Sequence, residues 1–351
     1  MIELTGLTPE ETEKLILDLS EPKYRAAQVY AWVQKGRDIA EMHNLPRSLR
    51  AKLEETACAQ AVLIERELVS SLDGTRKFLF RLRDGNCIEG VLMQYEYGYT
   101  LCVSTQVGCR MGCRFCASTL DGCVRNLSAG EILGEVVAVQ RLLEEKNARI
   151  RNVVLMGSGE PFDNYDAVVR FLRLANDERG QNISLRHISL STCGLVPEML
   201  RFADEGLPVT LSISLHAPND RIRRQIMPIS QRYSVREVLD AAKVYLQKTG
   251  RRVIFEYALI RGVNAGREHA EELAALLRGM QCHVNVIPLN AVPERHLEGV
   301  SEAEVTAFLK TLEKNHISAT RRREMGDDIE GACGQLRKKT MREEQADANR
   351  F

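Results

Sequence analysis

The pattern of apolar and polar residues divides the chain into regions with different periods. Residues 1–65 have helical spacing, and a first helix is expected to begin with Thr8 as N-cap and Pro9 as its first residue. Residues 66–99 instead form alternating runs broken by Asp-Gly pairs at 73–74 and 84–85, which is typical of β-hairpins. The pattern therefore predicts a helical N-terminal domain, followed by a small antiparallel sheet that links it to the rest of the chain.

From residue 100 onward, short apolar strands alternate with amphipathic helices. Repeated βα units predict a parallel sheet, and we expect an α/β fold in which residues 100–336 form a partial (β/α)6 barrel. Residues 337–351 show no apolar period and are expected to be a flexible tail. The expected strands cover 100–104, 152–157, 187–191, 209–214, 252–259, 283–288 and 318–323. The expected helices lie near 130–145, 164–176, 196–205, 234–248, 267–280 and 302–315.

Composition and charge narrow the class of protein. The chain has 351 residues, of which 44% are apolar, so a large core can form. Lys+Arg and Asp+Glu each number 48, a balance that argues against a protein wholly wrapped in nucleic acid but allows a local basic face. The acidic N-terminus has no signal-peptide pattern, and no apolar run reaches membrane-spanning length. We therefore expect a soluble cytoplasmic protein, whose clustered cysteines are metal ligands or catalytic groups rather than structural disulfides.

Three cysteines, Cys109, Cys113 and Cys116, follow the first expected barrel strand with the spacing C-x3-C-x2-C. Glycines at 108, 112 and 122 allow the loop to bring the thiolates together. Three thiolates on a 4Fe-4S cluster leave one iron open, and the amino and carboxylate groups of S-adenosylmethionine (SAM) can occupy it. The alternative is a zinc site with a distant fourth ligand. With Phe115 before the third cysteine, the motif resembles that of the radical-SAM superfamily.

Polar and small residues stand at the ends of the following strands, where barrel enzymes carry their chemistry. Individually they are compatible with tight turns or loop-capping hydrogen bonds. Together they predict a wall of groups around SAM. The members are Gly159, Glu160, Ser191, Ser214, Leu215, His216 and Asn290. Two further cysteines are Cys102 and Cys333. The residues alone predict only that each is a small, buried, apolar side chain.

Longer motifs identify a family. "TLCVSTQVGCRMGCRFCAST", "RNLSAGEI", "MGSGEPFDN", "SISLHAPND", "RRQIMPI", "FEYALIRGVN", "CHVNVIPLN" and "DIEGACGQLR" occur in this order. Together they closely resemble the RlmN/Cfr family of radical-SAM RNA adenine methyltransferases, from about residue 20 to about 338. Pro161 and Pro288 are more similar to the RlmN branch than to Cfr, while Ser158 departs from the larger apolar residue that many relatives carry.

The resemblance implies a role for each matched residue. Cys109, Cys113 and Cys116 would hold the cluster, and the seven strand-end residues would line SAM. Cys333, in a C-terminal loop of the barrel core, would carry the methyl group, and Cys102 would resolve its RNA adduct by forming a disulfide. Glu89 would be the catalytic base, although the residues alone favour a solvated acid on a strand.

The resemblance also implies the reaction and the partners. The enzyme would methylate carbon 2 of an adenosine in the peptidyl transferase centre of 23S rRNA, and of an adenosine in the anticodon loop of tRNA. It would use two SAM molecules per turnover and an external electron donor, act through S-methylcysteine and a covalent RNA adduct, and work as a monomer away from membranes. Arginines are candidate contacts to the RNA backbone, namely Arg221, Arg223, Arg224, Arg251, Arg252, Arg321, Arg322 and Arg323.

Three other functions remain open at the level of sequence. A Cfr-like enzyme would methylate carbon 8 of adenine in 23S rRNA. A non-catalytic iron-sulfur protein would use the same cysteines only to support RNA binding. A radical-SAM activase would act on a protein, and would have no use for Cys333.

Overall fold

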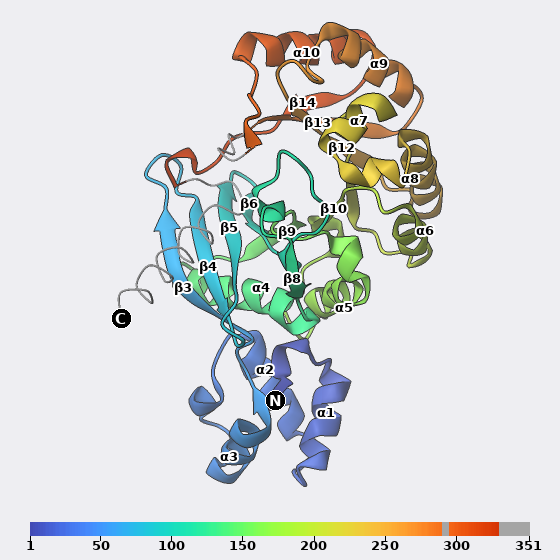
Figure 1. Ribbon diagram of the computed structural model, residues 1–351. Coiled ribbons are helices and arrows are strands. Elements are labelled where there is room, and N and C mark those ends of the chain that lie inside the picture. Colours follow the sequence, from blue (N-terminus) through green and yellow to red (C-terminus); the bar gives the residue numbers. More distant parts are fainter. Residues whose placement is uncertain (290–294, 330–351) are drawn as a thin grey trace.

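The structure is a computed structural model that describes residues 1–289 and 295–329. Its N-terminal part contains the helices α1 (Pro9–Asp18), α2 (Arg25–Gln34) and α3 (Arg47–Thr56). The expected start of α1 is confirmed, because the Thr8 side chain accepts a hydrogen bond from Glu11 N, and Thr8 N donates to the Glu11 side chain. The three helices enclose a small core of their own and lie at one end of the molecule (Figure 1).

One sheet forms the centre of the molecule, and its strand order is β14-β13-β12-β11-β10-β9-β6-β5-β4-β3. All pairings from β6 to β14 are parallel, so the expected α/β fold with a partial barrel is confirmed. Within the described residues the two edge strands, β14 and β3, do not pair with each other, so the barrel is open. The parallel strands are β6 (Gly98–Cys102), β9 (Ile150–Leu155), β10 (Ile188–Thr192), β11 (Thr210–Ser214), β12 (Val253–Leu259), β13 (Cys282–Pro288) and β14 (Ala319–Arg321).

The hairpin region extends this sheet, so the expected antiparallel hairpins are confirmed. Strands β3 (Val62–Val69), β4 (Arg76–Leu82) and β5 (Cys87–Tyr95) pair in antiparallel fashion, and β5 continues the ladder onto β6. β6 then pairs with β9 in parallel. The two patterns share β6 because a strand can offer an antiparallel edge on one side and a parallel edge on the other.

Helices between the parallel strands complete the βα units and cover the sheet (Figure 1). Their bounds are α4 (Ala129–Glu144), α5 (Tyr165–Asn176), α6 (Val196–Asp204), α7 (Asp220–Ile226), α8 (Val235–Thr249), α9 (Arg267–Leu277) and α10 (Glu302–Lys314). The short helix α7 was not expected, although Asn219 and Asp220 provide an N-terminal signal for it. Within the described ranges, no helix has the length and apolar character needed to cross a membrane.

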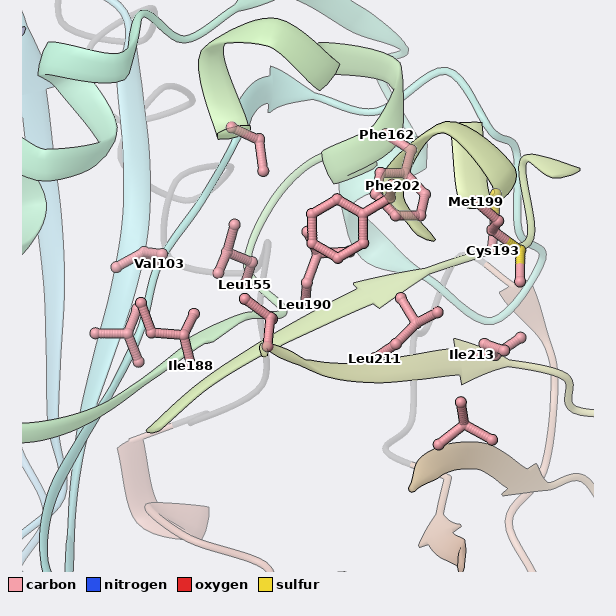
Figure 2. Packing of buried hydrophobic residues seen from close by; sticks show 14 of the residues in the cluster. Val103, Leu155, Phe162, Ile188, Leu190, Cys193, Met199, Phe202, Leu211 and Ile213 are labelled. Carbon is pink, nitrogen blue, oxygen red and sulfur yellow. The ribbon is translucent and has the colours of Figure 1, made fainter. Parts of the chain in front are cut away.

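The main core lies between the parallel strands and the helices that follow them. Figure 2 shows Leu155, Ile188 and Leu190 on neighbouring strands, with Phe162 and Phe202 packed above them. All are buried, and the two phenylalanine rings lie 5.3 Å apart between centroids. This packing holds the carboxyl ends of β9 and β10 in fixed positions, and the candidate site is built on those ends.

Candidate active site

The loop that carries the three clustered cysteines is held at its base by a small hairpin. β7 (Gln106–Gly108) pairs with β8 (Cys123–Asn126), and Cys109 N donates to Gly122 O at 2.9 Å. Gly108 has a φ of +80°, and a Cβ atom there would stand 2.1 Å from Gly122 O. Only glycine therefore fits at this crossing. The hairpin was not expected from the sequence, because its strands are too short to show a period.

The cysteine side chains gather inside this loop. Cys109 and Cys113 are buried, and Cys116 is half-buried. Burial raises the pKa of Cys109 to about 12, and negative charge on Cys116 raises it further. Burial also raises the pKa of Cys113, and charges on Cys116 and Cys109 add to the effect. The three sulfurs therefore lie within electrostatic range of one another, two of them shielded from water.

This donor set fits a 4Fe-4S cluster. No group of three ligating side chains in the described residues could hold a single metal ion. In a cluster each thiolate binds a different iron atom, so its cysteine sulfurs stand farther apart than the ligands of one ion. Buried thiols of raised pKa also need positive charge nearby before they can become thiolates. The iron atoms would supply that charge, and one protein cation lies close by.

The protein cation is Arg223, on α7. It is completely buried and donates to three carbonyl oxygens, Leu215 O at 3.1 Å, Ser214 O at 3.1 Å and Cys193 O at 2.6 Å. Its Nη1 atom is buried and has no hydrogen-bond partner among the described residues. Arg223 therefore cannot contact an RNA backbone at the surface, and that expectation is wrong. The residue belongs to the wall beneath the cysteine loop.

Gly159 and Glu160 follow β9 directly. Gly159 has a φ of +114°, and a Cβ atom there would meet Thr105 Oγ1 at 2.6 Å. The buried Glu160 carboxylate accepts from Cys193 N at 2.7 Å and from Phe162 N at 3.1 Å. Burial raises the pKa of Glu160, and these hydrogen bonds act in the opposite direction. Glu160 thus ties the segment after β9 to the end of β10, and side-chain hydrogen bonds with Thr192 and Cys193 also lower its pKa.

The segment that follows β11 is also buried. His216 adopts a φ of +53°, and its Nδ1 accepts from Ala258 N at 2.9 Å. Burial and the charge of Arg223 lower the pKa of His216 to about 3, so the ring is neutral at physiological pH. The His216 ring meets Phe115 of the cysteine loop edge to face, at 4.6 Å between centroids. His216 therefore links the cysteine loop to β12.

Ser191 and Ser214 are half-buried at the carboxyl ends of the adjacent strands β10 and β11. Leu215 is fully buried, and its backbone N donates to Glu256 O at 3.2 Å. The described residues of the set expected to line SAM thus lie at or just beyond the carboxyl ends of successive strands, as the sequence predicted. Asn290 lies outside the described residues.

Glu89 lies on β5 in a buried environment, so the expectation of a solvated acid is wrong. Its side chain is 3% exposed, and Lys77 Nζ on β4, itself 0% exposed, lies 3.2 Å from Glu89 Oε2. Glu89 O accepts from Ser104 Oγ at 2.8 Å, and Ser104 Oγ accepts from Ser158 N at 2.9 Å. The base expected from the family resemblance is therefore fixed next to the end of β9 through Ser104.

Cys102 lies on the same face of the sheet as Glu89. Cys102 pairs with Val91 in the β5–β6 ladder, and Lys77 pairs with Val91 in the β4–β5 ladder. Side chains alternate along a strand and match across a ladder, so these residues and Glu89 share one face. Cys102 is buried in a small apolar cluster with Val91 and Met93, against which Met325 packs.

The C-terminal segment approaches this face before the described residues end. Gly326 N donates to Asp73 Oδ2 at 2.9 Å, and Asp328 accepts from Ser70 Oγ at 2.6 Å and from Ser71 N at 2.8 Å. These bonds fasten residues 326–328 to the turn between β3 and β4. Cys333 itself lies outside the described residues.

Comparison with known proteins gives two family matches and several full-length relatives. Residues 103–312 match the model described as "Radical SAM superfamily", and residues 2–59 match "Ribosomal RNA large subunit methyltransferase N-terminal domain". Curated proteins from Alkaliphilus oremlandii and Clostridioides difficile, each called "Probable dual-specificity RNA methyltransferase RlmN", are 52% and 50% identical to the chain. Each alignment covers 96% of this chain and 98% of the relative.

A crystal structure of a radical SAM methyltransferase from Sphaerobacter thermophilus has 44% sequence identity and a TM-score of 0.92. The match covers 95% of this chain and 99% of that one. The chain belongs to the RlmN family of radical-SAM RNA methyltransferases. The RlmN family resemblance stated from the motifs is confirmed, and membership implies that the enzyme is a transferase that uses SAM and a 4Fe-4S cluster.

Two buried charged residues of this RlmN family member were missed by sequence reasoning. Lys77 lies in an alternating strand, and a lysine there is normally solvated. Arg223 lies among other arginines and looked like one more surface charge. The only available signal was the N-cap of α7, which would have placed Arg223 on a helix beside Ile222 and Ile226.

We predict that Lys77→Met lowers the free energy of unfolding by about 3–5 kcal/mol, because it leaves the buried Glu89 carboxylate without its cation. Chemical denaturation of the purified enzyme measures the loss. Lys243→Met is the matched control, since Lys243 pairs with Asp240 at the surface and should cost less than about 1 kcal/mol. The double variant Lys77→Met/Glu89→Gln should recover part of the loss. Equal losses for Lys77→Met and Lys243→Met would contradict the buried pair.

Proposed function

We propose that this enzyme methylates carbon 2 of an adenosine in 23S rRNA, and also of an adenosine in tRNA. The relatives are named dual-specificity RNA methyltransferases, which supports two RNA substrates. The observation that carries the proposal is the placement of Glu89 and Cys102 on one buried sheet face, at the edge where β6 enters the cysteine loop. A base and a second thiol beside a radical-generating site are what methylation of an electron-poor carbon requires.

In this proposal Cys109, Cys113 and Cys116 hold the cluster. Gly159, Glu160, Ser191, Ser214, Leu215, His216 and Asn290 surround SAM. When bound, the cluster and SAM would supply the radical chemistry that activates a methyl group on the protein. Glu160 accepts a hydrogen bond from the ammonium group of SAM, and Gly159 leaves room for the backbone to approach the ligand. The buried His216 and the half-buried Phe115 pack together and limit the access of water between the cysteine loop and β11.

Cys333, Cys102 and Glu89 act in sequence on the methyl group. The Cys333 thiolate takes a methyl group from one SAM by displacement, and the carbon on Cys333 then bonds to carbon 2 of adenine. Glu89 removes the proton from carbon 2. The one electron that this substitution releases passes to the external electron carrier. The Cys102 thiol then loses its proton and attacks the sulfur of Cys333, the bond between that sulfur and the methylene carbon breaks, and this carbon takes up a proton to become the methyl group of the released RNA. The resulting disulfide is reopened by an external thiol reductant. The ion pair with Lys77 supports the base role, because it fixes the position of the Glu89 carboxylate on the buried face.

The arginines that remain as candidate RNA contacts are fewer than the sequence suggested. Arg221 and Arg224 are exposed on α7, which follows the carboxyl end of β11. Arg323 is exposed just beyond β14. Arg251 and Arg252 precede β12. They therefore stand at the amino ends of the parallel strands, opposite the carboxyl ends that carry the site. We propose that Arg221 and Arg224 bind RNA phosphates near the site.

The product distinguishes the proposed reaction from its alternatives. Incubation with SAM, a low-potential reductant and 23S rRNA or tRNA should yield 2-methyladenosine, identified by mass spectrometry of nucleosides against synthetic standards. 8-Methyladenosine would instead show a Cfr-like enzyme. Failure to form any 5′-deoxyadenosine from SAM under these conditions would show a binding protein without catalysis, and 5′-deoxyadenosine without RNA product would favour an activase.

The two cysteine roles predict opposite phenotypes. Cys333→Ala should abolish RNA methylation while SAM cleavage continues at a reduced rate, because the methyl acceptor is lost but the cluster remains. Cys102→Ala should accumulate RNA covalently bound to protein, visible as a shifted band on denaturing gels. Cys282→Ala, a buried cysteine at the start of β13, is the control and should behave as the wild type. Normal turnover of Cys102→Ala with no adduct would exclude the resolving role.

The proposed RNA contacts are tested by salt dependence. Arg221→Gln and Arg224→Gln should each weaken RNA binding and reduce the slope of log K against log salt by about 1, because each removes one phosphate contact. Arg252→Gln is the control, since its side chain is exposed at the opposite edge of the sheet. Fluorescence anisotropy with a labelled RNA hairpin measures both quantities. An unchanged slope in both α7 variants would remove these residues from the interface.

A further inference from the structure

Arg223 is buried, and its hydrogen bonds to the protein do not compensate its positive charge. Its guanidinium is completely buried, and within the described residues it donates only to neutral carbonyl oxygens. Moving a full positive charge out of water is costly unless a negative charge compensates it. Burial accordingly lowers the pKa of Arg223, and negative charges on Cys193, Cys113 and Asp220 counteract the shift.

The helix that carries Arg223 is bound directly to the cysteine loop. Arg114 N, next to Cys113, donates to Ile226 O at 2.9 Å, and Arg114 Nη1 donates to Gln225 O at 3.2 Å. The loop therefore rests on the carboxyl end of α7. Arg223 stands one helical turn earlier, with its Nη2 atom on the carbonyl groups of Cys193 and Ser214. The guanidinium thus lies between the cysteine loop and the ends of β10 and β11.

One nitrogen of this guanidinium remains available. Arg223 Nη1 is buried and has no partner among the described residues. An unpaired buried donor is rare in proteins, because it costs about 1–3 kcal/mol, and more for a charged group. The loop that carries Cys113 lies against the same helix, because Arg114 N donates to Ile226 O. A bound anionic group near Cys113 would satisfy both the charge and the free donor.

We propose that Arg223 is the counter-charge of the iron–sulfur cluster, which stabilises the cluster's added negative charge on reduction and holds the strand ends of the SAM site around it. This inference rests on the proposed assignment of Cys109, Cys113 and Cys116 as cluster ligands. Reduction adds one electron, which a low-potential one-electron donor supplies. A buried cation beside the cluster favours the reduced state, since net charge and hydrogen bonds to sulfur set the potential of such clusters. Arg223 is therefore a positioning residue that acts through the cluster.

The experiment is a redox titration of the reconstituted enzyme with dithionite and mediators, followed by electron paramagnetic resonance in the absence of SAM. Omitting SAM ensures that weaker SAM binding cannot produce the shift. Arg223→Gln should lower the equilibrium constant for cluster reduction about tenfold or more, which for one electron is about 59 mV toward negative potential. Arg223→Lys keeps the charge and should change the constant by less than about threefold. Arg236→Gln, a surface arginine on α8 that pairs with Asp240, should leave the potential unchanged.

Each outcome decides between a charge role and a purely structural one. An unchanged potential in Arg223→Gln, or an equal shift in Arg223→Lys, would overturn the proposal. If Arg223→Gln does not accumulate as folded protein, Arg223→Lys decides alone, because a shift beyond about tenfold despite retained charge contradicts a counter-charge. The proposed function fails separately: a wild-type enzyme that shows no cluster signal after anaerobic reconstitution, or loses none on substitution of Cys113, has no cluster there.

Discussion

The site depends on the double pairing of β6. This strand joins β5 in antiparallel fashion and β9 in parallel, so it belongs to both patterns of the sheet. Its antiparallel side sets Cys102 opposite Val91 and on the same face as Glu89. Its parallel side brings the chain to the carboxyl edge, where the cysteine loop begins. A slip of one residue in either ladder would turn Glu89 or Cys102 to the other face, because side chains alternate along a strand.

Buried charges connect the parts of the site, and each is compensated in a different way. Glu89 has the cation of Lys77 beside it. Glu160 is held by two backbone N–H groups from the segments that follow β9 and β10. Arg223 binds three carbonyl oxygens and keeps one donor free. Such groups contribute little net stability, because desolvation offsets most of their attraction. Their value lies in the fixed electrostatic environment that they impose on a cofactor.

Two expectations failed, and a third feature stayed undecided, for one common reason. Glu89 and Arg223 were expected at the surface because acids and arginines usually are, and the pattern of the hairpin region did not show which barrel strand it would join. In each case the deciding contact comes from a distant part of the chain. Glu89 is covered through Lys77 and Ser104, Arg223 through the loop at Arg114, and the hairpins through the β5–β6 ladder. Local pattern carries no information about these contacts.

The sequence by itself determined the alternation of strands and helices, the parallel sheet, and the loop that gathers three cysteines. These features follow from hydrophobic period and from glycine at positions such as Gly108, both of which are local properties. Its longer motifs also identified the family. The tertiary structure alone decided which charges are buried and which side chains share a face. Those properties arise from strand register and from helix α7 packing beneath the cysteine loop, and so depend on residues far apart in the chain.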